Sequence, residues 1–238
     1  WQCVGFMHGV MNTDNMSIHG ITIDYGPYGW LENYDPNWTP NTTDSQYRRY
    51  RFGNQPQIAQ WNLYQLANAL YPLINEAKPL EDILESFINE FDSDYKTMFL
   101  SKLGLFTSTE TDSELIANLE ATLQLSETDM TIFFRNLSLI KKEDSIENAI
   151  AKIKDAFYIP EEITNTILEN WTAWFTLYLK RLAAEVISDE DRATKMSRIN
   201  PKYVLRNYMA QLSIDAADKG DFSLVDELYT LLQKPYDE

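Results

Sequence analysis

The chain has 238 residues, which allows one or two domains, and its 36 acidic and 20 basic side chains give a formal net charge of −16. Hydrophobic residues make up 44% of the sequence, enough for a packed core, so a disordered acidic tail is excluded. The acidity also excludes a nucleic-acid coat or an anionic-membrane binder, because both need a positive surface. Apolar stretches are too short to span a bilayer, and the single cysteine, Cys3, excludes an internal disulfide. Since the chain begins with Trp1 and no signal pattern follows, we expect a piece of a longer protein.

Glycine and charge divide the chain unevenly. Six of the eight glycines lie in the first 53 residues, and residues 1–56 carry a net charge of −2. Residues 57–238 carry the remaining −14. We therefore expect residues 1–56 to form a segment of loops and strands, and residues 57–238 to form an acidic, helical part whose charge serves solvation.

Apolar residues at helical spacing predict a series of helices in residues 57–238. Pro79, Pro160 and Pro201 stand at positions typical of a first helical turn, and Ser126 with Asp129 is typical of a capping pair. The predicted helices cover residues 58–70 with an end near Pro72, 79–91, 130–137, 146–157, 160–182, 200–220 with a stop at Gly220, and 222–232.

The only β signal lies in the early segment. Met16 to Ile18 and Ile21 to Ile23 read as two short strands that are joined by a turn at Gly20, because β-branched residues favour strands. We expect this hairpin to fold the chain back and to bring Asp24 close to Asn15. A carboxylate and an amide oxygen, with phosphate oxygens and waters, are ligands that Mg²⁺ accepts. The sequence therefore predicts a nucleotide-metal site at Asn15 and Asp24.

The spacing also fits the catalytic core of protein kinases, which use His-x-Asp-x-x-x-x-Asn followed by Asp-Phe-Gly. His8 and Asn15 keep the offset of seven residues, and Asp24 begins the triplet Asp-Tyr-Gly. The position of the kinase aspartate holds Val10, which cannot accept a proton, whereas Asp14 stands beside Asn15. Either the catalytic base has moved to Asp14 or the site is inactive.

A longer resemblance covers nearly the whole chain. It rests on HGVMNTDNMSIHGITIDYGPYGWLENYDP, on RYRFGNQPQIAQWNLYQLANAL and on NPKYVLRNYMAQ. These blocks resemble the selenoprotein O family, whose members have a kinase-like fold and transfer AMP from ATP to protein hydroxyl groups; some bacterial members are associated with UMP transfer. The resemblance implies Asp14 as proton acceptor, Asn15 and Asp24 as ligands of Mg²⁺ or Mn²⁺, and ATP as the nucleotide bound at Asp24.

For several other residues, the sequence allows either a functional or a structural role. We expect His8 to support the loop by hydrogen bonding and His19 to lie on the surface. The cluster Arg48, Arg49 and Arg51 either contacts phosphate or an acidic partner, or pairs with neighbouring carboxylates, and we favour the pairing. The tryptophans at positions 61, 171 and 174 lie at helical spacing and are expected in the core.

Taken together, the sequence predicts a mainly α fold: the C-terminal lobe of a protein-kinase-like fold, with a short β-hairpin at the metal loop and a large helical remainder. The Gly-rich loop and strand lysine of a kinase N-lobe are not found in this chain, so we expect the fragment alone to be inactive. The expected partners are ATP and proteins with hydroxyl side chains, in the bacterial cytoplasm or in a mitochondrion. The alternatives are a kinase-like phosphotransferase and a non-catalytic pseudokinase scaffold.

Overall fold

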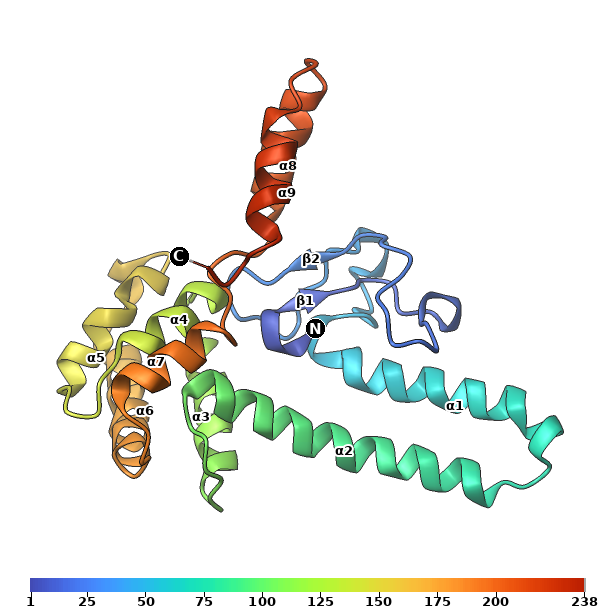
Figure 1. Ribbon diagram of the computed structural model, residues 1–238, viewed down its shortest axis with the longest axis horizontal. Coiled ribbons are helices and arrows are strands. Elements are labelled where there is room, and N and C mark those ends of the chain that lie inside the picture. The colour runs from blue at the N-terminus through green and yellow to red at the C-terminus, as the bar shows by residue number, and fades with distance from the viewer. Residues whose placement is uncertain (238) are drawn as a thin grey trace. The chain divides into compact units, whose positions relative to one another are not determined.

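The computed structural model describes residues 1–237 and is mainly helical, as the sequence predicted. Helices follow one another along most of the chain (Figure 1). Their bounds are α1 (Gln55–Ile74), α2 (Lys78–Leu103), α3 (Asp112–Leu123), α4 (Met130–Asn136), α5 (Ile146–Ile153), α6 (Asn165–Ala183), α7 (Asp189–Ser197), α8 (Asn207–Ala217) and α9 (Ser223–Leu232). Within residues 1–237, no helix has the length and apolarity that a membrane span requires.

The small sheet lies elsewhere than the sequence predicted. Its two strands are β1 (Phe6–Met7) and β2 (Gly29–Trp30). They flank residues 8–28, the candidate site segment, which contains Asp14, Asn15 and Asp24. The predicted strands at residues 16–18 and 21–23 are wrong, because both stretches lack strand structure. Only the turn between them forms, with the Gly20 N–H donating to the Ser17 carbonyl at 3.1 Å. A two-stranded hairpin is marginal without a covering layer, so β-branched residues alone did not produce one here.

The chain forms two compact units. Unit 1 comprises Trp1–Gln2, Phe6–Gly29 and Asp35–Lys96, and unit 2 comprises Cys3–Gly5, Trp30–Tyr34 and Thr97–Glu238. Unit 1 therefore contains the whole candidate site segment together with α1 and most of α2. Unit 2 contains the remaining helices.

In unit 1, α1 begins with Pro56 in its first turn, where the missing N–H costs nothing. The helix continues past Pro72 to Ile74, two residues beyond the predicted end. It stops at Asn75, which adopts a left-handed conformation with φ of 56° and donates its N–H to the Tyr71 carbonyl at 2.7 Å. The next helix, α2, also extends well beyond the predicted 79–91, and Ile83 on its apolar stripe is 62% exposed.

The core of unit 2 is an aromatic cluster built around α6. Trp171, Trp174 and Tyr178 are buried, and the rings of Trp174 and Tyr178 stack with their centroids 4.9 Å apart. The core prediction for the two tryptophans is thus confirmed, whereas Trp61 on α1 is 43% exposed and that prediction was wrong. The long helix starts at Asn165, because Pro160–Glu162 forms a separate 3-10 turn.

The N-terminus of α4 is capped by Asp129, whose Oδ1 accepts the Ile132 N–H at 2.8 Å. The same buried carboxylate receives the Arg206 guanidinium at 2.6 Å and the Tyr158 hydroxyl at 2.5 Å. Burial, and then the bond to Asp129, raises the pKa of Tyr158 above its usual range. The predicted partner in capping, Ser126, does not bond the helix; its hydroxyl lies 3.3 Å from that of Thr128.

Asn200 does not begin a helix, contrary to the sequence prediction. Its side chain is buried, accepts a hydrogen bond from the Lys102 ammonium at 3.0 Å and donates one to the Lys102 carbonyl at 2.9 Å. The ammonium also donates to the Cys3 carbonyl at 2.6 Å and lies 4.0 Å from the centre of the Phe134 ring. Burial lowers the pKa of Lys102 to about 8. The predicted helix begins only at Asn207, whereas the last helix, α9, matches its predicted range within one residue.

Candidate functional site

The candidate catalytic loop, residues 8–15, follows β1 and is organised around His8, which is fully buried. Its Nδ1 accepts the Val10 N–H at 3.4 Å, so Nε2 carries the proton and donates to the Ile23 carbonyl at 2.7 Å. This bond ties the start of the loop to the residue that precedes Asp24. The expectation that His8 supports the loop by hydrogen bonding is confirmed.

Gln55, at the beginning of α1, holds the strand that leads into the loop. Its Oε1 accepts the His8 N–H at 3.0 Å, and its Nε2 donates to the Phe6 carbonyl at 3.0 Å. One buried amide thus satisfies a backbone donor and a backbone acceptor, much as a neighbouring strand would. Because these two bonds anchor the start of the loop to the helix α1, they fix the position at which the loop begins.

Two more buried amides fix the middle of the loop. Asn41 donates to the Gly9 carbonyl at 3.1 Å, and Asn62 of α1 donates to the Met11 carbonyl at 3.1 Å. We call Gln55, Asn41 and Asn62 the amide clamps. They come from positions far along the chain, and no spacing in the sequence links them to the loop, so the sequence did not reveal Asn41 or Asn62.

Gly9 shows how closely the loop is packed. It adopts φ of +83°, and a methyl group on its Cα would lie 2.5 Å from the Pro27 carbonyl oxygen. Only glycine combines this left-handed backbone with so close an approach. The loop and the segment that follows Asp24 are therefore held against one another at this residue.

Asp14 and Asn15 lie on a short 3-10 turn, Thr13–Asn15. The Asn15 Nδ2 donates to the Val10 carbonyl at 3.0 Å, which leaves its Oδ1 free to serve as a ligand. The side chain of Asp14 is exposed, and within residues 1–237 no hydrogen bond or ion pair engages its carboxylate. Asp14 is thus presented to solvent by a loop that is itself fixed.

Asp24 follows the anchored Ile23 and adopts a left-handed backbone with φ of 53°. Such a conformation is uncommon for a residue other than glycine, although aspartate tolerates it better than most. Its carboxylate is exposed and, like that of Asp14, has no partner in the part of the chain that the structure describes.

The donor set of this loop fits a hard divalent cation. It offers the Asn15 amide oxygen and the Asp24 carboxylate, none of which is used by another described residue, and oxygen donors of these types suit Mg²⁺ or Mn²⁺. Residues 1–237 hold no group of three or more His, Cys, Asp and Glu side chains that could bind a metal alone. These donors therefore suit a cation that takes its remaining ligands from phosphate and water, as Mg²⁺ usually does.

Other residues singled out by the sequence play smaller parts. His19 lies exposed in the turn after Ser17, as expected. The predicted pairing of the arginine cluster was wrong: among the described residues, Arg48, Arg49 and Arg51 form no ion pair. Arg49 instead places its guanidinium 4.7 Å from the centre of the Trp61 ring, and backbone carbonyls accept from the other two.

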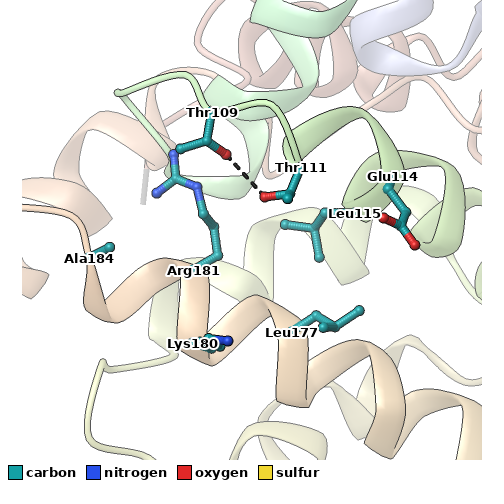
Figure 2. A pocket seen from close by; sticks show the side chains of 8 residues that line it. All are labelled: Thr109, Thr111, Glu114, Leu115, Leu177, Lys180, Arg181 and Ala184. Carbon is teal, nitrogen blue, oxygen red and sulfur yellow. Dashed lines mark hydrogen bonds between the residues drawn. The ribbon is translucent and has the colours of Figure 1, made fainter.

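A pocket in unit 2 contains none of the predicted site residues. It lies between α3 and α6, with Arg181 directed towards Thr109 and Lys180 directed elsewhere (Figure 2). Arg181 donates to Asp112 and to Glu185, each at 2.8 Å, so its charge is neutralised. Although burial opposes it, the bonds from Arg181 and Thr109 lower the pKa of Asp112. The cluster is a structural ion-pair network, and we assign it no chemistry.

Comparison with known proteins finds matches over nearly the whole chain. A family profile described as "Protein adenylyltransferase SelO" matches residues 1–233. The chain is 76% identical over 238 residues to "Protein nucleotidyltransferase YdiU" of Flavobacterium johnsoniae, and 52% identical over 249 residues to the protein of the same name from Rhodopirellula baltica. In each case the match covers 100% of this chain and 46% of the relative. The chain thus spans about half the length of the curated relatives that it matches.

Proposed function

The chain belongs to the SelO family of nucleotidyltransferases, and from this premise we propose that it carries the catalytic loop of a protein adenylyltransferase. The proposed reaction moves AMP from ATP to a hydroxyl side chain of a protein and releases pyrophosphate. The observation that supports it is a fixed loop that presents an unpaired carboxylate, Asp14, beside an amide oxygen that is free to bind a metal, that of Asn15.

In this proposal Asp14 is the proton acceptor. The hydroxyl oxygen of the acceptor protein attacks the α-phosphorus of ATP, the bond from that phosphorus to the bridging oxygen breaks, and the electron pair leaves with pyrophosphate. The Asp14 carboxylate takes the hydroxyl proton, a role that requires hydrogen-bond reach of the substrate and no competing partner. Its exposure and lack of a protein partner meet the second condition.

Asn15 and Asp24 would hold Mg²⁺ or Mn²⁺. When bound, such a cation offsets the negative charge of the phosphates. The protein's own contribution is the placement of these oxygens: the Asn15 amide is turned by its bond to the Val10 carbonyl, and Asp24 is set by the bond of His8 to Ile23. Fixed donors of this kind need no reorganisation during the reaction, which is the source of much enzymatic rate enhancement.

We further propose that the fold is kinase-like and that this chain supplies part of its C-terminal lobe. The order of His8, Asn15 and Asp24 along the chain supports this, as does the support of the loop by a following helix. Because the reaction consumes ATP and the matched relatives are bacterial, the cytoplasm is the compartment that we propose.

The experiment that tests the function uses the full-length protein with Mg²⁺ or Mn²⁺ and ATP that is labelled at either the α- or the γ-phosphate. Label from the α position on protein supports adenylyl transfer, whereas label from the γ position would show a phosphotransferase, and no label would favour a scaffold. Asp14→Asn and Asp24→Asn, which keep side-chain volume, should each lower kcat by roughly 10²–10⁴. Glu76→Gln, an exposed acid in the same unit, is the matched control and should leave kcat unchanged. Full activity in Asp14→Asn would refute the assignment of the base.

A further inference from the structure

The arginine cluster, Arg48, Arg49 and Arg51, holds the only Lys or Arg residues among residues 1–77. It belongs to unit 1, which also contains the candidate site segment, residues 8–28. Arg48 and Arg49 are exposed, and Arg51 is half-buried. In a chain whose net charge is −16, the cluster gives the unit of the candidate site a local positive surface.

The guanidinium groups of the cluster keep hydrogen-bond donors for a ligand. Within residues 1–237, none of the three forms an ion pair. Arg48 donates to the Asn37 carbonyl at 3.4 Å, and Arg51 donates to the Arg48 carbonyl at 3.3 Å. A guanidinium carries five N–H donors, so a single bond leaves most of them available. No described carboxylate neutralises these positive charges.

Arg49 is held in place by its neighbours. Its guanidinium lies 4.7 Å from the centre of the Trp61 ring on α1. The Asp44 carboxylate accepts its backbone N–H at 2.9 Å, and the Asn54 side chain donates to its carbonyl at 2.5 Å. Because both the backbone and the side chain are anchored, less conformational entropy is lost when Arg49 binds a ligand.

The side chain of Tyr50 connects the cluster to the candidate catalytic loop. Its ring centre lies 5.7 Å from the Arg49 guanidinium, and its hydroxyl donates to Oδ1 of Asn12. Asn12 stands two residues before Asp14, and its carbonyl accepts the Asn15 N–H at 3.0 Å. One tyrosine therefore links the cluster to the turn that presents Asp14. A polypeptide bound at Arg49 would thus pass the proposed proton acceptor within a few residues.

The backbone of the cluster indicates which anion it suits. Phosphate sites usually use free backbone N–H groups, as at the N-terminus of a helix or in a turn. Here these donors are taken, because the Asp44 carboxylate accepts the N–H groups of Arg49 and Tyr50 at 2.9 and 2.8 Å. Backbone carbonyls accept the N–H groups of the other two arginines. A ligand therefore meets guanidinium groups alone.

Exposure of the cluster favours a polypeptide over a nucleotide. Nucleotides and other small ligands bind in concave sites that cover most of their surface, whereas Arg48 and Arg49 are exposed. Guanidinium groups on an open surface pair well with carboxylates, in a bidentate geometry that lysine does not provide. Three of them on neighbouring residues can meet successive acidic side chains of an extended peptide.

We propose that the arginine cluster binds Asp or Glu side chains of the acceptor protein, a few residues from the hydroxyl group that is modified. The proposal rests on the proposed function, because it identifies the ligand as the acceptor polypeptide that passes Asp14. Residues 57–238 carry a net charge of −14 and repel an acidic segment, whereas the cluster attracts it. The cluster then acts as a specificity determinant that favours hydroxyl groups with acidic neighbours.

The test measures peptide binding and nucleotide transfer separately, with the full-length protein. Rhodamine-labelled peptides carry one serine in a Gly-rich background, with Asp-Asp, Asn-Asn or Lys-Lys placed at each position on either side of it. Without ATP or metal, fluorescence anisotropy should find a position where the Asp-Asp peptide binds about three- to tenfold tighter than the Asn-Asn peptide. Added salt should remove the difference, since the charges are exposed. Transfer from α-labelled ATP then gives KM for each peptide and for ATP.

Arg49→Gln should weaken binding of the Asp-Asp peptide about two- to fivefold and raise its KM equally, with binding of the Asn-Asn peptide and KM for ATP unchanged. Lys78→Gln, which removes an exposed charge elsewhere in unit 1, is the matched control and should do neither. Arg49→Glu should favour the Lys-Lys peptide over the Asn-Asn peptide at the same position. A variant that had merely lost its fold would not show this reversal.

Three outcomes would overturn the proposal. They are equal binding of the Asp-Asp and Asn-Asn peptides at every position, an Asp-Asp preference that Arg49→Gln leaves unchanged, and a raised KM for ATP in Arg49→Gln with an unchanged peptide KM. The last result would assign the cluster to the nucleotide phosphates. If the Asp-Asp preference appeared in anisotropy but no α-label were transferred, the proposed reaction would fail while the selectivity of the cluster stood. Normal transfer without an acidic preference would refute the cluster's role and leave the proposed function intact.

Discussion

Replacing Gln55 tests whether the catalytic loop depends on the amide clamps. Gln55→Met keeps the length of the side chain but removes both of its hydrogen bonds, to the His8 N–H and to the Phe6 carbonyl, each 3.0 Å long. Both backbone groups belong to buried residues, and an unsatisfied buried donor or acceptor costs about 1–3 kcal/mol. Some relaxation and water entry will recover part of this, so we expect the local opening of the loop to become easier by about 2–4 kcal/mol.

Amide hydrogen exchange measures this opening directly. A loss of about 2–4 kcal/mol corresponds to exchange at His8 that is faster by roughly 30- to 1,000-fold, because each 1.4 kcal/mol is a factor of ten. Gln57→Met, an exposed position on the same helix, is the matched control. The proposed activity should fall at least about tenfold in Gln55→Met, because a displaced loop misplaces Asp14. Protection at His8 equal to that in Gln57→Met would show that the clamp does not hold the loop.

Three further predictions concern stability, each measured by denaturant or thermal unfolding. Burial lowers the pKa of Lys102 to about 8, so as the pH rises the folded protein releases this proton before the unfolded chain does. The free energy of unfolding of wild type, relative to that of Lys102→Met, should therefore rise by about 3 kcal/mol from pH 8 to 10.5. A difference that does not change with pH would contradict the burial argument. Gly9→Ala should cost well over the roughly 1 kcal/mol expected for Gly20→Ala, because both residues have positive φ but only Gly9 faces a backbone carbonyl; equal costs would refute this. Asp129→Ala should cost about 3–5 kcal/mol, since it leaves the Arg206 guanidinium half-buried without its carboxylate and removes a helix cap; a loss under 1 kcal/mol would contradict this.

The helices could be predicted where apolar periodicity and capping residues coincide. The ranges expected for α4 and α9 agree with the structure within one residue, and Pro79 lies in the first turn of α2. The helix α5 begins at the predicted Ile146 but ends at Ile153, four residues before the predicted end. The helices α3 and α7 were not predicted, and α7 shows why: its sequence is rich in charge and presents only a short apolar face. The start expected at Asn200 failed because that side chain satisfies Lys102, a contact across 98 residues that no local pattern contains.

The candidate site divides in the same way. The sequence singles out Asp14, Asn15 and Asp24 because they stand close together in one sequence block, and their roles stay predictions. The local structure of this segment could not be predicted: the hairpin was absent, and a hydrogen bond from the His8 side chain to the Ile23 carbonyl links the start of the loop to the residue before Asp24 instead. Apolar spacing does not by itself show burial: Ile83 on the apolar stripe of α2 is 62% exposed, because periodicity states which face is apolar and not whether another element covers it.

The surroundings of Val10 support the proposal that Asp14 is the proton acceptor. Its N–H is bonded to His8 and its carbonyl to Asn15, so the residue lies inside the hydrogen-bonded ring that shapes the loop. Its side chain is half-buried, and a methyl group at Gly26 would lie 3.8 Å from it, at ordinary packing distance. A carboxylate at this position would be partly desolvated against that surface. Asp14 is the single carboxylate between His8 and Ile23, and it stands on the turn where the backbone leaves the ring and the side chain reaches solvent. In the proposed function, the half-buried Val10 therefore supports the loop, and the exposed Asp14 is available to accept a proton.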